Sequence, residues 1–170
     1  MSGGREHHPQ GHKEGIAVAS STDLRRLSLD MVRASRRYLD LISRDLDPAV
    51  FDTRDFVTAV KSMITKNPQA RVRIIVLRPE TLIGVQHRLV DLSQRLTSFM
   101  AIRRPGPDHR EFNEALMICD QRHLIHRKLS DRFDGHAWFD APGRAAKLQQ
   151  AFNELWEYGE PDPNFRQLFL

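Results

Sequence analysis

The sequence has one cysteine, Cys119, among 170 residues, so no disulfide can form within the chain. It has no apolar run near the roughly 18 residues that a membrane span needs, and its first residues lack the apolar core of a secretion signal. These absences exclude a secreted disulfide scaffold and a membrane-spanning protein. They predict a cytoplasmic protein with a reduced, buried cysteine.

Several functional motifs are also absent. There are no paired cysteines, no His-Glu-x-x-His and no dense acidic loop, so we expect no metal. No Gly-x-Gly-x-x-Gly, Walker loop or Gly-x-Ser-x-Gly elbow occurs, so we expect no nucleotide cofactor and no serine-hydrolase site. The sequence therefore predicts no cofactor.

The composition is that of an ordinary globular protein, with 40% hydrophobic and 28% charged residues. Residues 1–19 are rich in glycine and contain His7, His8 and His12, and we interpret them as a disordered, solvated tail. Residues 20–170 are long enough for one domain.

Positive charge is concentrated in the middle of the chain. Between Lys66 and Arg110 there are nine Lys or Arg and three acids, a local charge of +6, whereas residues from Glu154 onward carry −3. The basic segment suits a phosphate-bearing partner. The alternative is that these charges only solvate the surface.

Hydrophobic periodicity predicts an alternating order of helices and strands. The expected strands are at 38–43, 72–77, 99–102, 115–120, 123–126 and 137–139, and the expected helices begin near residues 22, 53, 79 and 142. This order predicts an α/β fold: a mixed, largely parallel sheet of about six to seven strands, with helices on both faces. The aromatic residues of the predicted strands, Phe99, Trp138 and Phe139, are interpreted as core residues. The sequence therefore gives little support for a surface on which nucleic-acid bases stack.

Ligands of open α/β sheets bind beyond the carboxyl ends of the strands. Several polar residues of this sequence follow predicted strands, and the candidate ligand-binding set is Arg78, Arg103, Arg104, Asn113, Asp120, Arg127 and Lys128. A rival hypothesis is a hydrolase or transferase in which His87 acts as a general base with Asp45 and Arg78. It requires His87 to lie within hydrogen-bonding reach of a carboxylate.

The C-terminal half resembles a known family. The run from Asn113 to Asp120, the later Ala137-Trp-Phe strand and a helix ending Phe152-Asn-Glu-Leu-Trp156 look like one half of a phospholipase D-like domain. That superfamily carries His-x-Lys-x4-Asp on an apolar strand, followed by Gly-Ser-x-Asn. The resemblance implies the same α/β fold over about residues 20–160.

The catalytic residues of that family do not carry over. The position of the nucleophilic histidine is Asn113 and that of the phosphate-holding lysine is Ala115, and only Asp120 matches. An amide nitrogen is not nucleophilic, so we expect no phosphodiesterase or phospholipase activity. Arg127 and Lys128 stand at the Gly-Ser positions and Ser130 at the asparagine position.

The whole chain also resembles a set of uncharacterised proteobacterial proteins with this degenerate half-domain, some fused behind an N-acetyltransferase domain for which 170 residues leave no room. The resemblance implies an accessory or regulatory module that binds a phosphorylated small molecule, a nucleic acid or a protein partner. Single-half members often pair across their site, so we expect a homodimer.

Overall fold

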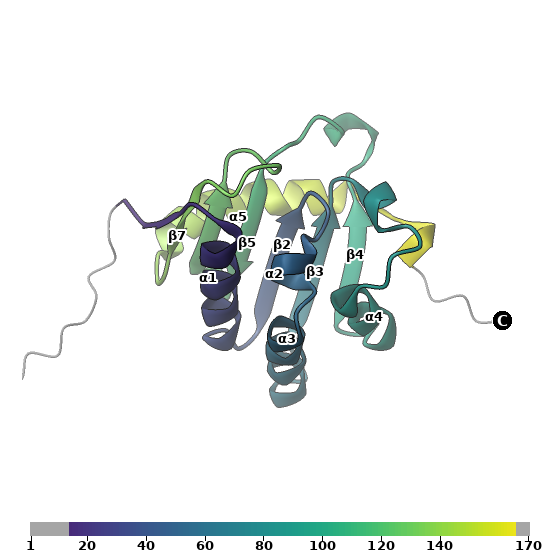
Figure 1. The fold of residues 1–170 in the computed structure, drawn as a ribbon, viewed down its shortest axis with the longest axis horizontal. Coiled ribbons are helices and arrows are strands. Elements are labelled where there is room, and N and C mark those ends of the chain that lie inside the picture. The colour runs from purple at the N-terminus through teal and green to yellow at the C-terminus, as the bar shows by residue number, and fades with distance from the viewer. Residues whose placement is uncertain (1–13, 166–170) are drawn as a thin grey trace, which may run out of the picture.

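The computed structural model describes residues 14–165, which form one mixed sheet with helices on both faces (Figure 1). Its strand order is β1-β7-β6-β5-β2-β3-β4-β8. The strands are β1 (Ile16–Val18), β2 (Tyr38–Ser43), β3 (Arg71–Val76), β4 (Met100–Arg104), β5 (Ala115–Cys119), β6 (His123–Arg127), β7 (Gly135–Trp138) and β8 (Glu160–Pro161). The α-helices are α1 (Ser21–Arg33), α2 (Pro48–Phe51), α3 (Arg54–Lys66), α4 (Arg88–Arg95) and α5 (Pro142–Glu157).

The prediction of a largely parallel sheet is wrong, although the mixed α/β class is confirmed. Only β2–β3 and β3–β4 pair in parallel, and the other pairs are antiparallel. Two helical crossovers build the parallel part. After β4 the chain returns through a loop instead of a helix, so β5 runs antiparallel beside β2 and starts a meander.

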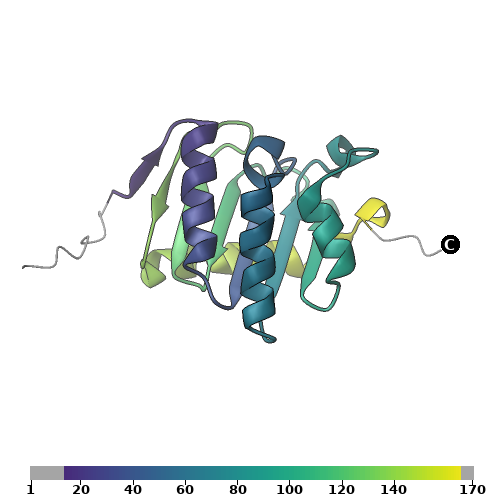
Figure 2. The ribbon, with the colours of Figure 1, turned by 60° about the horizontal axis from the view of Figure 1, so that its bottom comes forward.

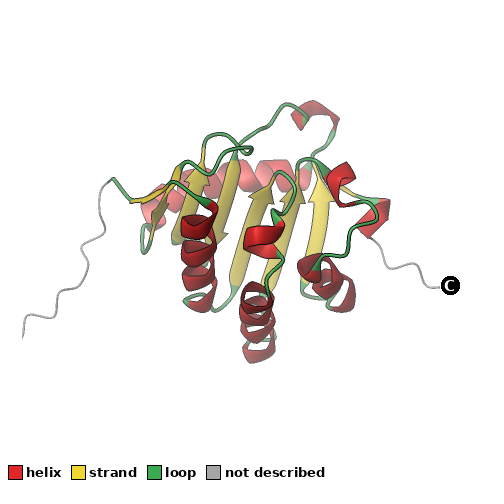
Figure 3. Ribbon diagram, viewed as in Figure 1, coloured by secondary structure: helices red, strands yellow, loops and turns green. Residues whose placement is uncertain are grey.

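The two faces of the sheet are covered unequally (Figures 2 and 3). Helices α1 to α4 cover one face, called here the α1 face, and α5 alone crosses the other, called the α5 face. Side chains alternate along each strand, so Leu39 and Leu41 of β2 join the larger core on the α1 face. Ile42 joins a smaller core around Phe152 on the α5 face.

Helix caps follow the local sequence. Ser20 and Thr53 precede α1 and α3, and their hydroxyls accept the N–H groups of Asp23 and Phe56, each at 3.1 Å. These positions agree with helices expected to begin near residues 22 and 53. Such caps each stabilise a helix by about 1 kcal/mol.

Several elements differ from the prediction, and the described sheet has eight strands instead of the expected six to seven because β1 and β8 were not predicted; α2 was not predicted either. The helix expected from Pro79 to Leu96 is a 3₁₀ turn (η1, Pro79–Leu82), an extended loop and the short α4. Gly84 interrupts the helix with φ +73°, a conformation that favours glycine. Strand β1 lies within the segment interpreted as a tail and pairs with β7, while residues 1–13 lie outside the described part.

Candidate functional site

Most predicted site residues gather at one edge of the sheet. The carboxyl ends of β2, β3, β4 and β6 and the amino end of β5 meet there, at the top of Figure 1, and we call it the upper edge. The predicted residues at this edge are Asp45, Arg78, Arg103, Arg104, Asn113, Arg127 and Lys128.

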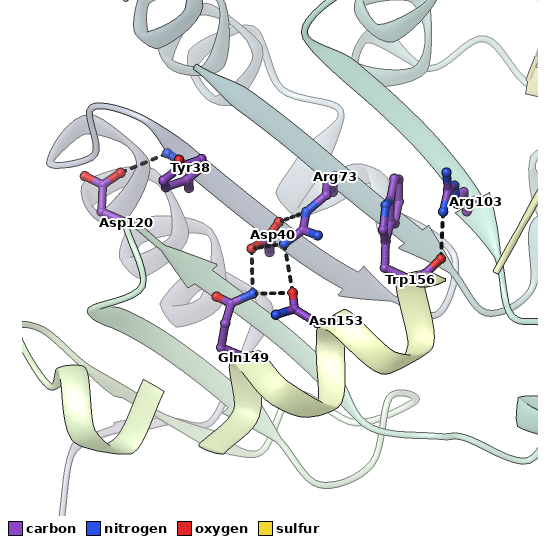
Figure 4. Close-up of polar contacts among 8 residues, drawn as sticks. All are labelled: Tyr38, Asp40, Arg73, Arg103, Asp120, Gln149, Asn153 and Trp156. Carbon is purple, nitrogen blue, oxygen red and sulfur yellow. Dashed lines mark hydrogen bonds and ion pairs between the residues drawn. The ribbon is translucent and has the colours of Figure 1, made fainter. Parts of the chain in front are cut away.

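Asp120 does not belong to this group. It lies in the β5–β6 turn at the opposite edge, and its carboxylate accepts the N–H groups of Arg36, Arg37 and Tyr38 at 2.8–2.9 Å (Figure 4). Because three main-chain donors take up its oxygens, Asp120 fastens β5 to the start of β2. Its assignment as a ligand-binding residue is corrected to a structural one.

The upper edge contains a pocket of about 280 Å³ on the α1 face. It is lined by Arg44, Asp45, Asp47, Thr81, Arg127, Ser130, Asp131, Arg132 and Phe133, and we call it the Arg127 pocket. Three arginines and three aspartates share this small space. The pocket therefore presents mixed charge instead of a purely cationic wall.

Arg127 is the buried cation of the pocket. Its side chain donates to the carbonyl of Arg132 at 2.8 Å, and only 7% of the residue is exposed. Burial lowers the pKa of Arg127, and the charges of Asp47 and Asp45 oppose this shift. A guanidinium stays protonated in such a site, so the pocket holds a fixed positive charge.

Asn113 and Ala115, the two positions compared with the family motif, lie beside this arginine. Ala115 is the register partner of Arg127 across β5 and β6, so an uncharged side chain lies opposite Arg127 on the neighbouring strand. The Oδ1 atom of Asn113 accepts the Ser130 hydroxyl at 2.5 Å, and its carbonyl accepts the Ser130 N–H at 2.8 Å. Asn113 therefore fastens the β6–β7 loop to β5.

The side chains of Arg103 and Arg104 already make polar contacts within the protein. Arg103 donates to the carbonyl of Trp156 at 2.8 Å and its guanidinium lies 4.3 Å from the centre of that indole (Figure 4). Arg104 forms ion pairs with Glu160 at 3.3 Å and Asp162 at 3.6 Å. These contacts attach β4 to the segment that follows α5, so neither arginine presents a free guanidinium.

Three other cations at the upper edge are exposed. Arg78, Lys128 and Arg132 have no side-chain hydrogen bond or ion pair with any residue between 14 and 165. Arg132 was not among the predicted residues, because nothing in its local sequence separates it from other loop arginines. We call these three residues the exposed cations.

The rival enzyme hypothesis is wrong about His87. This residue is the N-cap of α4 and is 1% exposed. Its Nε2 lies 2.8 Å from the carbonyl of Leu46, and its Nδ1 accepts the N–H of Leu89 at 3.2 Å. Both ring nitrogens are thus engaged by the main chain, and neither contacts Asp45 or another carboxylate.

Cys119 is buried in β5, and burial raises the pKa of its thiol to about 12.

Among residues 14–165, no three His, Cys, Asp or Glu side chains are placed to hold a metal ion. None of the helices described is both long and apolar enough to cross a membrane.

A polar network under α5 was missed. Arg73 on β3 pairs with the buried Asp40 on β2 at 2.8 and 3.0 Å, and Gln149 of α5 donates to the same carboxylate at 2.9 Å (Figure 4). Asn153 accepts from both Arg73 and Gln149. The strand pattern places Asp40 and Arg73 on a sheet face, but only packing brings α5 onto them.

Comparisons with known proteins place the chain in a family. Residues 20–168 match the family described as Domain of unknown function (DUF7931), and the chain belongs to this family. No curated protein matches the sequence.

Solved structures show the fold class. The chain is similar to Nuc from Salmonella typhimurium, a phospholipase D family member, with a TM-score of 0.60 and 14% identity over 91% of this chain and 100% of that one. NucT from Helicobacter pylori matches with a TM-score of 0.58 and 13% identity over 87% and 98% of the two chains. The fold is therefore phospholipase D-like, as the sequence resemblance implied.

A third structure is TrmBL2, described as an archaeal chromatin protein with a novel mode of DNA binding. Its TM-score is 0.62 and its identity 12%, over 88% of this chain. The present chain spans only 55% of TrmBL2. At these identities the likeness concerns the fold alone.

Proposed function

We propose that this chain is a non-catalytic phospholipase D-like module that binds a phosphate-bearing ligand at the upper edge, with nucleic acid as the first candidate. The observation that carries the proposal is the buried Arg127, a permanent cation opposite the position where the family motif has its lysine. Of the exposed cations, Arg132 lines the same pocket, while Arg78 and Lys128 lie elsewhere along the upper edge, and all three are free to contact further phosphates.

The absence of catalysis follows from the residues at the motif. Asn113 has no nucleophilic nitrogen, and its side-chain oxygen is already hydrogen-bonded to Ser130. His87 is buried against main-chain groups and does not line the Arg127 pocket, so it does not supply the base of the rival hypothesis. A chromogenic phosphodiester and single-stranded DNA should remain uncleaved, with and without divalent metals. Turnover that disappears in the Arg127→Gln variant would refute this part of the proposal.

Binding is tested by titration of labelled single- and double-stranded 20-nucleotide probes at low and moderate salt. We expect affinity to fall with salt, because each neutralised phosphate contributes about −0.7 to the logarithmic slope on single strands and about −0.9 on duplexes. Combined replacement of Arg78, Lys128 and Arg132 by alanine should weaken binding at least about tenfold and flatten this slope.

The matched control removes the same charge elsewhere. Lys61, Arg95 and Lys147 are exposed on three helices, and their combined replacement by alanine should leave the affinity within about twofold. Equal losses in both triple variants would mean that only net charge matters. Absence of salt-dependent binding by the unmutated protein would overturn the nucleic-acid proposal. Pyrophosphate and an acidic peptide, tested in the same titration, identify a small phosphorylated ligand or a protein partner instead.

We also propose a two-fold homodimer in the cytoplasm. The supporting argument is that the sequence resembles one half of a phospholipase D-like domain, and the chain aligns with the whole length of Nuc. Light scattering at micromolar concentration should give twice the chain mass, and a strict monomer would contradict the dimer. Cell fractionation tests the location.

A further inference from the structure

A second cavity lies on the α5 face at the ends of β6 and β7. Its volume is about 390 Å³, larger than the 280 Å³ of the Arg127 pocket and within the range of ligand sites. It is lined by His126, Lys128, Leu129, Arg132, Asp134, Gly135, His136 and Trp138, and we call it the Trp138 cavity. The two cavities share only Arg132, because the β6–β7 loop runs between them.

Aromatic rings form the wall of this cavity. His126 and His136 are register partners on adjacent strands, and the ring of His136 lies 5.7 Å from that of Trp138 at an interplanar angle of 31°. All three side chains lie on the same face of the sheet. Trp138, interpreted from the sequence as a core residue, is only half-buried and lines the cavity.

The rings are held in place by their neighbours. Glu114 lies 3.2 Å from the Nε2 atom of His126, and the guanidinium of Arg144 lies 4.4 Å from the centre of the Trp138 ring. Gly15 closes the Nε1 edge of the indole so tightly that a Cβ there would stand 2.7 Å from that nitrogen. The aromatic wall is therefore fixed before any ligand arrives, which lowers the entropy cost of binding.

Besides Arg144 and Glu114, which contact the rings, further charged groups line the cavity itself. Lys128 and Arg132, two of the exposed cations, line it, and Asp134 is its one carboxylate. A flat aromatic wall beside unpaired cations matches a group that is both planar and attached to phosphate. Aromatic side chains bind nucleobases by stacking, and this requires a base whose face is free. A duplex keeps its base faces stacked, so a single strand fits and a duplex does not.

We propose that the Trp138 cavity receives a base of single-stranded nucleic acid against His136 and Trp138, while Lys128 and Arg132 contact the adjoining phosphates. This inference rests on the proposed function and specifies its ligand: the strand crosses the β6–β7 loop from the Arg127 pocket to the Trp138 cavity. Arg132, which lines both, is the residue that connects them.

The test uses Trp138 as the reporter. The chain has two tryptophans, so the Trp156→Phe variant leaves Trp138 as the only one. This variant is titrated with a mixed-sequence single-stranded 12-mer and with an abasic 12-mer of equal charge. We expect the 12-mer with bases to quench Trp138 fluorescence and to bind at least about fivefold more tightly than the abasic strand.

Trp138→Leu, measured by anisotropy of labelled strands, should remove the preference for bases and leave the affinity for the abasic strand within about twofold. Tyr158→Ala is the matched control, because Tyr158 is an exposed aromatic residue beyond the other end of α5. Should Trp138→Leu melt at a much lower temperature, the exposed His136 provides a milder variant, His136→Ala, which should lose part of the preference.

The outcomes separate the two proposals. Equal affinity for both 12-mers, with unchanged Trp138 fluorescence, overturns the base site and leaves the phosphate-binding function intact. Binding of neither strand, together with quenching by adenosine alone, retains the base site and overturns the phosphate-binding function. Binding of neither strand and no quenching by adenosine overturns both.

Discussion

The two halves of the sheet use their positive charges differently. On the β3–β4 side, Arg73, Arg103 and Arg104 contact carboxylates, a main-chain carbonyl and aromatic rings, whereas Arg78, which follows β3, makes none of these contacts within residues 14–165. On the β6–β7 side, Lys128 and Arg132 face solvent without partners among the residues described. We call the first group the anchored cations. The basic middle of the sequence belongs mostly to the anchored side, so local charge density does not identify a binding surface.

The largest effect is expected from breaking the contacts of Arg73. Asp40→Ala removes the carboxylate that Arg73 and Gln149 share beneath α5 and leaves them only the side-chain oxygen of Asn153 as a common acceptor. Arg73 retains some water contact, so we expect the free energy of unfolding to fall by about 2 kcal/mol, less than for a fully buried pair. Urea unfolding measures the change. Asp30→Ala, at an exposed position of α1, is the control and should change stability by less than about 0.5 kcal/mol.

A smaller effect is expected from Arg103→Ala. This variant loses one hydrogen bond to a carbonyl and the contact with the Trp156 ring, which together stabilise the fold by about 1 kcal/mol. Oligonucleotide affinity should stay within about twofold of the unmutated protein, whereas Lys128→Ala should lower it with no loss of stability. The reverse pattern would show that the anchored cations bind the ligand after all.

The ion pair between Arg88 and Asp52 is intermediate between the anchored and the exposed cations, because it is only partly exposed. Breaking it should change the free energy of unfolding least. Burial alone would raise the pKa of Asp52, but the N–H of Arg88, His87 and the Arg88 guanidinium together lower it. A carboxyl group whose pKa is lowered by folding stabilises the fold when the pH is above the pKa that the group has in the unfolded chain. This stabilisation is lost as the pH falls through the pKa that the group has in the folded protein.

The Asp52→Asn variant should therefore be less stable than the parent at pH 7, by less than about 1 kcal/mol because the pair is partly exposed. The difference should shrink below about pH 4, near the ordinary pKa of aspartate. Urea unfolding at pH 7, 5 and 3 measures it. A difference that grows as pH falls would contradict the cause given for the pKa shift.

Much of the fold could be predicted because its signals are local. The strands around Leu41, Ile74 and Ile118 are apolar runs bounded by turn residues, and α3 and α5 carry clear apolar stripes. The direction of β5 could not be predicted, since no local pattern tells whether a loop crosses the sheet or returns beside it. Strand β1 was missed because three residues are too few to show a period.

The candidate site was predicted only in part. Rules for strand ends brought Arg78, Arg127 and Lys128 to one edge of the sheet, the upper edge, but they also selected Asp120, which follows a strand running the opposite way and lies at the other edge. Trp138 packs against the smaller core, as interpreted, but it also lines a cavity, and an aromatic residue in a short strand looks the same in sequence whether or not one side of it is open. His87 was expected on a helix, whereas it caps one with both ring nitrogens engaged.

The sequence by itself determined the α/β class and most of the helices and strands. These properties depend on residue type and on neighbours along the chain. Only the tertiary structure decided which cations are anchored and which are free, because an arginine finds its partner across strands that are distant in sequence. It also placed the buried Arg127 opposite Ala115 and opened the Trp138 cavity, since both depend on strand register and on where α5 covers the sheet.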